Sequence, residues 1–371
     1  MDYFGSPHII SNNMNLTGFE GSQQKEFWKT LRRNVSDHFK TNGISTKSNP
    51  AMVAKTIAML MFYLAPVVIL LTFQVNVWIG LLLVMLAGIG KAGIGMSVMH
   101  DGLHGSYSSK KWVNRLTGAS MYLIGSNVFN WKIQHNIYHH AYTNMHGLDE
   151  DIQTRWIIRL CEHTPVKPIH RFQHLYALFL YSLMSLSMLF GDITQLITYN
   201  QTGITRKHNA SPVRELLKAL LVKVIYLFVM LALPLLYTDY TWWQVVTGFL
   251  VMHLVAGFIL SIVFQMAHIT EGAQQPIPNE TVVTANSWAI HQLLTTSSFA
   301  RNNRLLNWYV GGLNFQVEHH LFPNICHMHY QDLSIIVEQT ATAFGVPYNI
   351  KPSLRAALIS HMRRLKELGR N

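Results

Sequence analysis

The chain has 371 residues, of which 49% are apolar and only 13% are charged. Soluble domains carry about 25% charged residues, so this composition excludes an ordinary soluble domain and favours a membrane protein. The formal net charge is +11, and the long apolar segments make a membrane surface a better partner for it than nucleic acid. The two cysteines, Cys161 and Cys326, provide no disulfide framework.

The first 50 residues are expected to form a polar segment and then an amphipathic helix. Residues 1–24 lack the basic and apolar regions of a secretory signal peptide. Residues 25–40 carry one apolar stripe at helical spacing. Its members are Phe27, Leu31, Val35 and Phe39. This helix is expected either to pack on the rest of the protein or to lie in the membrane interface, and both alternatives stay open.

Four apolar segments are long enough to cross a bilayer as helices, which takes about 20 residues each. They are residues 52–73, 76–98, 217–237 and 241–266. Short loops without Lys or Arg join them in pairs, so they form two hairpins. Basic residues flank both hairpins, and the positive-inside rule places these outer ends in the cytoplasm. The predicted fold is therefore an all-α membrane protein with four transmembrane helices in two hairpins and a cytoplasmic helical cap.

The predicted domain boundaries follow these segments. An N-terminal part (1–50) precedes a membrane domain (51–350), and a basic tail (351–371) follows it. Two ionisable residues lie inside the apolar segments. We expect Lys91, near a helix end, to extend toward the membrane surface, and His253 to be an internal hydrogen-bonding residue.

Histidines gather in three clusters at or beyond the ends of the predicted spans. The clusters are His100/His104, His135/His139/His140 and Gln316/His319/His320, with His268 at the end of the last span. A helix turns once in about 3.6 residues, so side chains four positions apart share a face. Chance produces some such pairs among 20 histidines, but three clusters indicate a metal site. Imidazole suits Zn, Cu, Fe and Ni, and two ions sharing this set is the economical interpretation.

A further apolar run, 174–198, is also long enough to span a bilayer. One extra crossing there would place the third histidine cluster opposite the first two. A single metal site cannot form across a bilayer, so we expect this run, and the shorter 118–130, to form interfacial or buried helices.

The residues around the clusters read HDGLHGSYS, WKIQHNIYHHAYTN and NWYVGGLNFQVEHHLFPNICHMHY. From about residue 50 to residue 350 the chain resembles the integral-membrane fatty acid desaturase family. The third box begins with Gln, which is similar to front-end desaturases and their bacterial relatives. The second box has one residue more before its His pair than many front-end members have. A His-Pro-Gly-Gly haem motif is absent from the sequence, so electrons are expected from a separate ferredoxin or cytochrome b5-type donor.

The resemblance implies a fatty acyl substrate, O₂ and two electrons, with two Fe ions as cofactor. Transferred position by position, the implied metal ligands are His100, His104, His135, His139, His140, His268, His319 and His320, with Gln316 where other members carry a ninth histidine. Neighbouring polar groups should orient the imidazoles. The candidates are Asp101, Asn136, Asn144, Asp149, Glu150, Asp151, Glu318, His327 and His329. The role of His291 stays open, and His8, His38, His163, His170, His174, His208 and His361 are expected at the surface.

The predicted function is a membrane acyl desaturase that introduces a cis double bond into a CoA-linked or lipid-linked chain. One alternative is a lipid or alkyl hydroxylase on the same scaffold. Another is a non-enzymatic metal-binding membrane protein, although a transporter should place its histidines within the spans. The expected location is a bacterial inner membrane, or alternatively the endoplasmic reticulum, with the active site on the cytoplasmic side.

Overall fold

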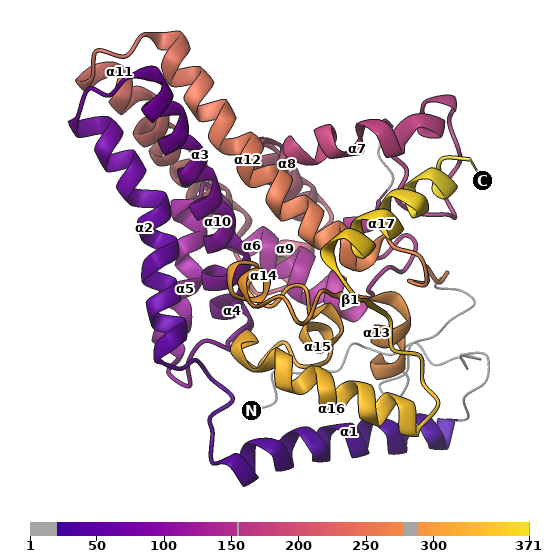
Figure 1. Cartoon of the computed structure of the whole chain (residues 1–371). Coiled ribbons are helices and arrows are strands. Elements are labelled where there is room, and N and C mark those ends of the chain that lie inside the picture. The colour runs from indigo at the N-terminus through magenta and orange to yellow at the C-terminus, as the bar shows by residue number, and fades with distance from the viewer. Residues whose placement is uncertain (1–20, 154–155, 278–287, 371) are drawn as a thin grey trace. The chain divides into compact units, whose positions relative to one another are not determined.

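The computed structural model describes residues 21–153, 156–277 and 288–370, so expectations for residues 1–20, including His8, lie outside the described residues. The regular secondary structure of the described chain is almost entirely helical (Figure 1). The chain divides into two compact units. Unit 1 comprises the described residues of Met1–Lys47, Ile133–Ala177 and Val263–Asn371, and unit 2 comprises Ser48–Lys132 and Leu178–Ile262.

The first membrane hairpin lies in unit 2. Helix α2 spans Pro50–Thr72 and α3 spans Val77–Gly93. The side chains of Asn49 and Asn76 cap the two helices by accepting hydrogen bonds from backbone N–H groups of the first turn. The helices pack closely, since a Cβ on Gly90 would lie 2.4 Å from the backbone nitrogen of Tyr63. After α3 the chain continues through a π-helical stretch, Ile94–Val98, into α4, Met99–His104.

The second hairpin pairs a helix with a π-helical interruption and a long final helix. Its elements are α10 (Pro212–Leu227), the π-helical Phe228–Ala232, α11 (Leu233–Tyr237) and α12 (Trp242–His268). Tyr240, in the turn before α12, joins this hairpin to the first. Its hydroxyl donates to the Phe73 carbonyl (3.3 Å) and accepts from the Val75 N–H (3.2 Å). The two predicted hairpins are thus confirmed.

The helix surfaces of unit 2 indicate contact with lipid. Within the described chain, four helices are long and apolar enough to cross a membrane, and large apolar side chains stand exposed along them. Trp78, Tyr237 and Trp242, beside the hairpin turns, are 75%, 74% and 69% exposed, which is typical of an aromatic belt at a membrane interface. The prediction of an all-α membrane protein is confirmed.

The apolar run 174–198 forms two helices rather than a straight span. Helix α7 covers Gln173–Ser182 and α8 covers Met184–Gln201. The stretch Pro168–Ser182 bends by 72° against α8, and the two would make a fifth span only if counted together. The run 118–130 falls on α5 (Lys111–Leu123) and the short α6 (Val128–Trp131), and α9 (Ile204–Lys207) follows α8.

Buried polar groups tie the helices of unit 2 together. Lys91 does not extend to the membrane surface as expected. It is only 3% exposed, and its ammonium donates to the Ile124 carbonyl and, over 3.0 Å, to the Tyr226 hydroxyl. The expected internal role of His253 is confirmed, because its ring contacts the hydroxyls of Ser185 and Tyr226 at 2.9 Å each. Burial of the Lys91 ammonium is tolerated because two oxygens inside the protein accept its hydrogen bonds.

Unit 1 is built from helices of 6 to 22 residues around an apolar core. Its elements besides those named are α1 (Gly21–Asn42), α13 (Trp288–Thr295), α14 (Arg304–Tyr309), α15 (Gln316–Leu321), α16 (Tyr330–Ala343) and α17 (Leu354–Leu368). A two-stranded parallel sheet pairs β1 (Ser298–Phe299) with β2 (Ile350–Lys351), in the register Ser298↔Ile350.

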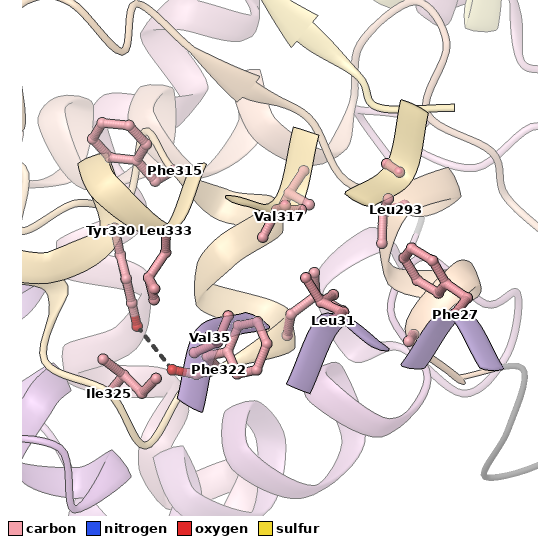
Figure 2. Packing of buried hydrophobic residues seen from close by; sticks show 14 of the residues in the cluster. Phe27, Leu31, Val35, Leu293, Phe315, Val317, Phe322, Ile325, Tyr330 and Leu333 are labelled. Carbon is pink, nitrogen blue, oxygen red and sulfur yellow. Dashed lines mark hydrogen bonds between the residues drawn. The ribbon is translucent and has the colours of Figure 1, made fainter. Parts of the chain in front are cut away.

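The apolar stripe of α1 lies in this core. Phe27 and Leu31 are fully buried and Val35 nearly so, and they belong to one cluster with side chains of α13, α15 and α16 (Figure 2). Of the two alternatives for this helix, packing on the protein is therefore the one observed, and its apolar face does not reach lipid.

Two histidines expected at the surface are buried in unit 1. His170 accepts from the Lys167 N–H (3.1 Å), and His361 contacts the Ile269 carbonyl (2.6 Å). Burial lowers the pKa of both rings, that of His361 to about 4. The surface expectation was wrong for these two because a neutral imidazole with a backbone partner is readily buried.

Candidate metal centre

Unit 1 brings six of the eight predicted histidine ligands together. Three come from the second box, one from the end of α12 and two from α15. They are His135, His139, His140, His268, His319 and His320, and all are buried. These histidines lie on or directly after the π-helical segment η2 (Lys132–His139), at the end of α12, and on α15. Adjacent imidazoles pack with ring centroids 4.4 to 6.0 Å apart.

The second box departs from the expected α-helical geometry. An α-helix would turn His140 away from His135, but η2 is π-helical, so residues five apart approach one another. The Nε2 atoms of His135 and His140 accordingly lie 3.3 Å apart. The π-helix directs all three histidines of this box toward one place.

Two triads of imidazoles have the spacing of metal ligands. In the first, His139, His268 and His320 each place a ring nitrogen within 4.8 Å of the others. In the second, His140, His319 and His320 do the same. The triads share His320, which makes them neighbouring parts of one cluster.

Carboxylates fix the orientation of His139. Its Nδ1 lies 3.0 Å from Oδ2 of Asp149 and 3.4 Å from Oδ2 of Asp151. Burial lowers the pKa of His139, but the two carboxylates together raise it more, and the net pKa lies above its usual range. In the neutral ring, a carboxylate facing Nδ1 favours the tautomer with its proton on that nitrogen, which leaves the lone pair of Nε2 directed into the cluster.

Uncharged groups orient the imidazoles of α15. Nδ1 of His320 lies 2.9 Å from Oε1 of Gln292 and 3.1 Å from the Thr143 hydroxyl. Nδ1 of His319 lies 3.3 Å from the Tyr330 hydroxyl. Gln292, Thr143 and Tyr330 were not predicted from the sequence, because an isolated amide or hydroxyl distant in sequence carries no recognisable spacing.

Asn144 and His291 hold the chain that follows the second box. The backbone N–H of Asn144 donates to Asp149 (2.8 Å), and its side chain donates to the carbonyls of His268 (2.8 Å) and Thr295 (2.9 Å). Its φ of +56° is tolerated best by Asn, Asp or Gly. Burial lowers the pKa of His291 to about 4, so this neutral ring donates to a backbone carbonyl, that of Thr143 (2.9 Å).

Gln316 lies directly against the cluster. Its Nε2 is 2.9 Å from Nε2 of His268 and 3.3 Å from Nε2 of His320. Its Oε1 is buried and has no hydrogen-bond partner among the described residues. The oxygen and nitrogen of an amide are distinguished only by such contacts, and a half-turn of the amide would point the oxygen at both imidazoles.

The other predicted orienting residues are placed as follows. Glu318 faces away from the imidazoles, and its carboxylate accepts from Ser298 (3.0 Å) and Tyr348 (2.9 Å). Burial raises its pKa to about 7. Asn136 is half-buried in η2, and His327 and His329 are buried where α16 begins. Glu150 opens a short 3₁₀ turn.

His100 and His104 belong to unit 2 and form a pair of their own. They lie one turn apart on α4, with ring centroids separated by 4.7 Å, and Trp131 packs edge-on against both. The predicted shared face is thus present. Asp101 is buried between them in sequence, and its backbone carbonyl accepts from Ser106.

The donor set of unit 1 fits a transition metal. Nε2 of His139 and Nδ1 of His268 are buried without a hydrogen-bond partner among the described residues, an arrangement that costs free energy unless something binds them. Asp149 contacts Nδ1 of His139, and Gln292 contacts Nδ1 of His320. Clustered imidazoles of this kind suit iron, copper, nickel or zinc.

Comparison with known proteins identifies the family. Residues 76–352 match the family model described as fatty acid desaturase. The chain is 32% identical to the sn-1 linoleoyl-lipid 6-desaturase of Arthrospira platensis over 93% of each chain. It is also 32% identical to the enzyme of that name from Synechocystis sp., over 94% of this chain and 97% of that one. An acyl-lipid (8-3)-desaturase of Physcomitrium patens is 31% identical over 95% of this chain and 73% of its own. The chain therefore belongs to the fatty acid desaturase family.

Proposed function

We propose that this protein is an acyl-lipid desaturase that introduces a cis double bond into a lipid-linked fatty acyl chain. The observation that carries the proposal is the buried histidine cluster of unit 1, with its carboxylate-oriented His139, in a chain of this family. The three relatives described above carry names that specify a lipid-linked acyl chain, and these names favour a lipid-linked substrate over acyl-CoA.

The cofactor we propose is a pair of iron ions held by the predicted ligands. The triads His139/His268/His320 and His140/His319/His320 would hold it in unit 1, with His135 beside them. By the motif resemblance, His100 and His104 supply the remaining nitrogens. Bound iron supplies the redox chemistry with O₂ that breaks unactivated C–H bonds, which side chains alone do not perform.

The protein's own groups keep this site dry and aligned. The six imidazoles are buried, so water has little access to the reacting centre. Asp149 and Gln292 hold protons on Nδ1 of His139 and His320 and keep the opposite nitrogens unprotonated. We propose that Gln316 binds the metal through its amide oxygen, directly or through water.

We further propose a location and an electron source. We propose that the histidine boxes lie on the cytoplasmic side of a bacterial inner membrane, and the basic residues flanking both hairpins support the cytoplasmic side. The electrons come from a separate one-electron carrier protein. Each double bond consumes one O₂, two electrons and two protons, removes two hydrogen atoms from the acyl chain and releases two water molecules.

The test is the fatty acid profile of a host that expresses the chain with a compatible donor. Gas chromatography–mass spectrometry should show a new unsaturated acid with the intact chain and none with His320→Ala. The matched control is His208→Ala, because His208 is half-buried outside the cluster and should leave the product in place. A hydroxy acid in place of the unsaturated one would show a hydroxylase, and the same product from His320→Ala would refute the role of the cluster.

A further inference from the structure

The exposed side of α1 carries a compact basic surface. A hollow of about 430 Å³ is lined there by Lys25, Trp28, Lys29, Arg32 and Arg33. The acidic groups on the same helix are Glu26, which pairs with Lys29 over 3.5 Å, and Asp37. We call these five lining residues the α1 basic patch. The patch is cationic, and an exposed pair such as Glu26–Lys29 changes that little.

The patch is not built to enter a membrane. An interfacial helix buries its apolar stripe among lipids, but here that stripe is already buried in the core of unit 1 (Figure 2). The remaining face of α1 offers positive charge and one half-buried aromatic ring, Trp28. Charge with a small aromatic centre suits a transient contact with an acidic protein.

Aromatic contacts lead inward from the patch to the histidine cluster. The guanidinium of Arg32 lies 5.9 Å from the centre of the Trp28 ring. Beneath it, Trp28 stacks on Phe322 and meets Trp288 edge-on, with ring centroids 5.6 Å apart in both pairs. Phe322 follows the third box by two residues. Trp28 is therefore the outer member of an aromatic group that begins at the surface.

Trp288 is hydrogen-bonded to a histidine of the cluster directly, and the backbone of Phe322 is linked to one through the Tyr330 hydroxyl. The indole N–H of Trp288 donates to the backbone carbonyl of His140 (3.1 Å). The hydroxyl of Tyr330 lies 3.5 Å from the Phe322 carbonyl, a contact drawn in Figure 2, and 3.3 Å from Nδ1 of His319. Two routes, each made of a ring contact from Trp28 followed by covalent and hydrogen bonds, thus join the patch to proposed metal ligands.

We propose that the α1 basic patch is the docking site of an acidic one-electron carrier protein, and that Trp28, Trp288 and Phe322 carry its electrons inward. This inference rests on the proposed function, which needs two electrons for each double bond. Each docked carrier is oxidised by one electron, so two docking events serve one turnover. Electron transfer through protein slows steeply with distance, and a carrier therefore has to dock where a short route begins.

The experiment compares two triple variants of the full-length enzyme in uncharged nanodiscs. Lys25→Glu/Lys29→Glu/Arg33→Glu reverses the patch. Arg355→Glu/Arg363→Glu/Lys366→Glu makes the same charge change at exposed positions of α17. Desaturation is driven either by a reduced, acidic plant-type ferredoxin or by photoreduced 5-deazariboflavin, a small uncharged donor that needs no docking site. The readout is the ratio of ferredoxin-driven kcat/KM to deazariboflavin-driven turnover.

We expect this ratio to fall on the order of tenfold in the patch variant at low salt and to stay at the wild-type value in the α17 variant. The difference should shrink as salt screens the charges. Equal ratios in all three active enzymes would overturn the docking site. The docking site would also be overturned if the patch variant lost binding to phosphatidylglycerol vesicles and kept the wild-type ratio, since the patch would then face anionic lipid. No unsaturated product from the wild type with either donor would instead refute the proposed function.

A second pair of variants tests the route inward. Trp28→Leu should lower ferredoxin-driven kcat and leave the KM for ferredoxin little changed, while Trp28→Phe, which keeps a ring on Phe322, should restore most of the rate. Equal rates for the Leu and Phe variants would remove the aromatic route from the proposal.

Discussion

Replacing one carboxylate oxygen of Asp149 by an NH₂ group tests how the proposed metal centre is oriented. The side chain of Asp149 is fully buried, and its Oδ2 accepts from Nδ1 of His139 (3.0 Å) and from the N–H of Asn144 (2.8 Å). Its Oδ1 accepts from the N–H of Asp151 (3.0 Å). Asp149→Asn keeps the shape but converts one acceptor into an NH₂ group, so in either orientation at least one buried donor faces another donor.

The size of the effect follows from these contacts. A buried donor left without an acceptor costs about 1–3 kcal/mol. If the NH₂ group faces His139, the ring can answer by moving its proton to Nε2, which removes the lone pair meant for the metal. Changes at groups that orient a ligand typically weaken metal binding about 10- to 100-fold. We therefore expect Asp149→Asn to lose iron affinity by roughly that factor.

The assay is an iron titration of purified apoprotein, followed by metal analysis after removal of free ions. Asp151→Asn is the matched control, because Asp151 is 17% exposed and lies farther from His139, at 3.4 Å. It should retain most of the affinity. Wild-type affinity in Asp149→Asn would show that this carboxylate does not select the tautomer of His139.

Three further predictions address other parts of the structure. Gln316→Leu should lower retained iron and turnover about tenfold, as measured by metal analysis and product yield, while Gln316→His should keep part of both. Wild-type iron content and turnover in the Leu variant would exclude a contact between Gln316 and the metal. Lys91→Met should destabilise the protein by about 1–3 kcal/mol in denaturation experiments, because it leaves buried oxygens unpaired. Lys110→Met, at an exposed position, should leave the stability unchanged. Equal changes in stability for the two variants would mean that Lys91 extends to the membrane surface after all. The pKa of His361 falls from 6.5 to about 4 on burial, so its contribution to stability is present above pH 6.5 and is lost as the pH falls through about 4. His361→Asn should flatten the pH profile of unfolding across that window, and an unchanged slope would contradict it.

The features carried by periodicity could be predicted from the sequence. Segment length and loop composition predict the two hairpins. Box spacing predicts the shared face of His100 and His104 on α4. These features depend only on neighbours along the chain, which a sequence displays directly.

The features that depend on distant partners could not be predicted. Lys91 is buried because Tyr226 and the Ile124 carbonyl, far away in sequence, receive its protons. Gln292 orients His320 across a separation of 28 residues. The π-helical backbone of the second box could not be predicted either, although it is a local feature, since nothing in its residue types distinguishes it from an α-helix.

The proposed iron pair is best examined through the metal content of the purified protein, read by metal analysis and Mössbauer spectroscopy beside His139→Ala and His320→Ala. We predict two iron ions per wild-type chain with the signature of a coupled pair, and loss of iron from both variants. A single zinc ion in an active enzyme, or undiminished iron in both variants, would contradict the proposed centre.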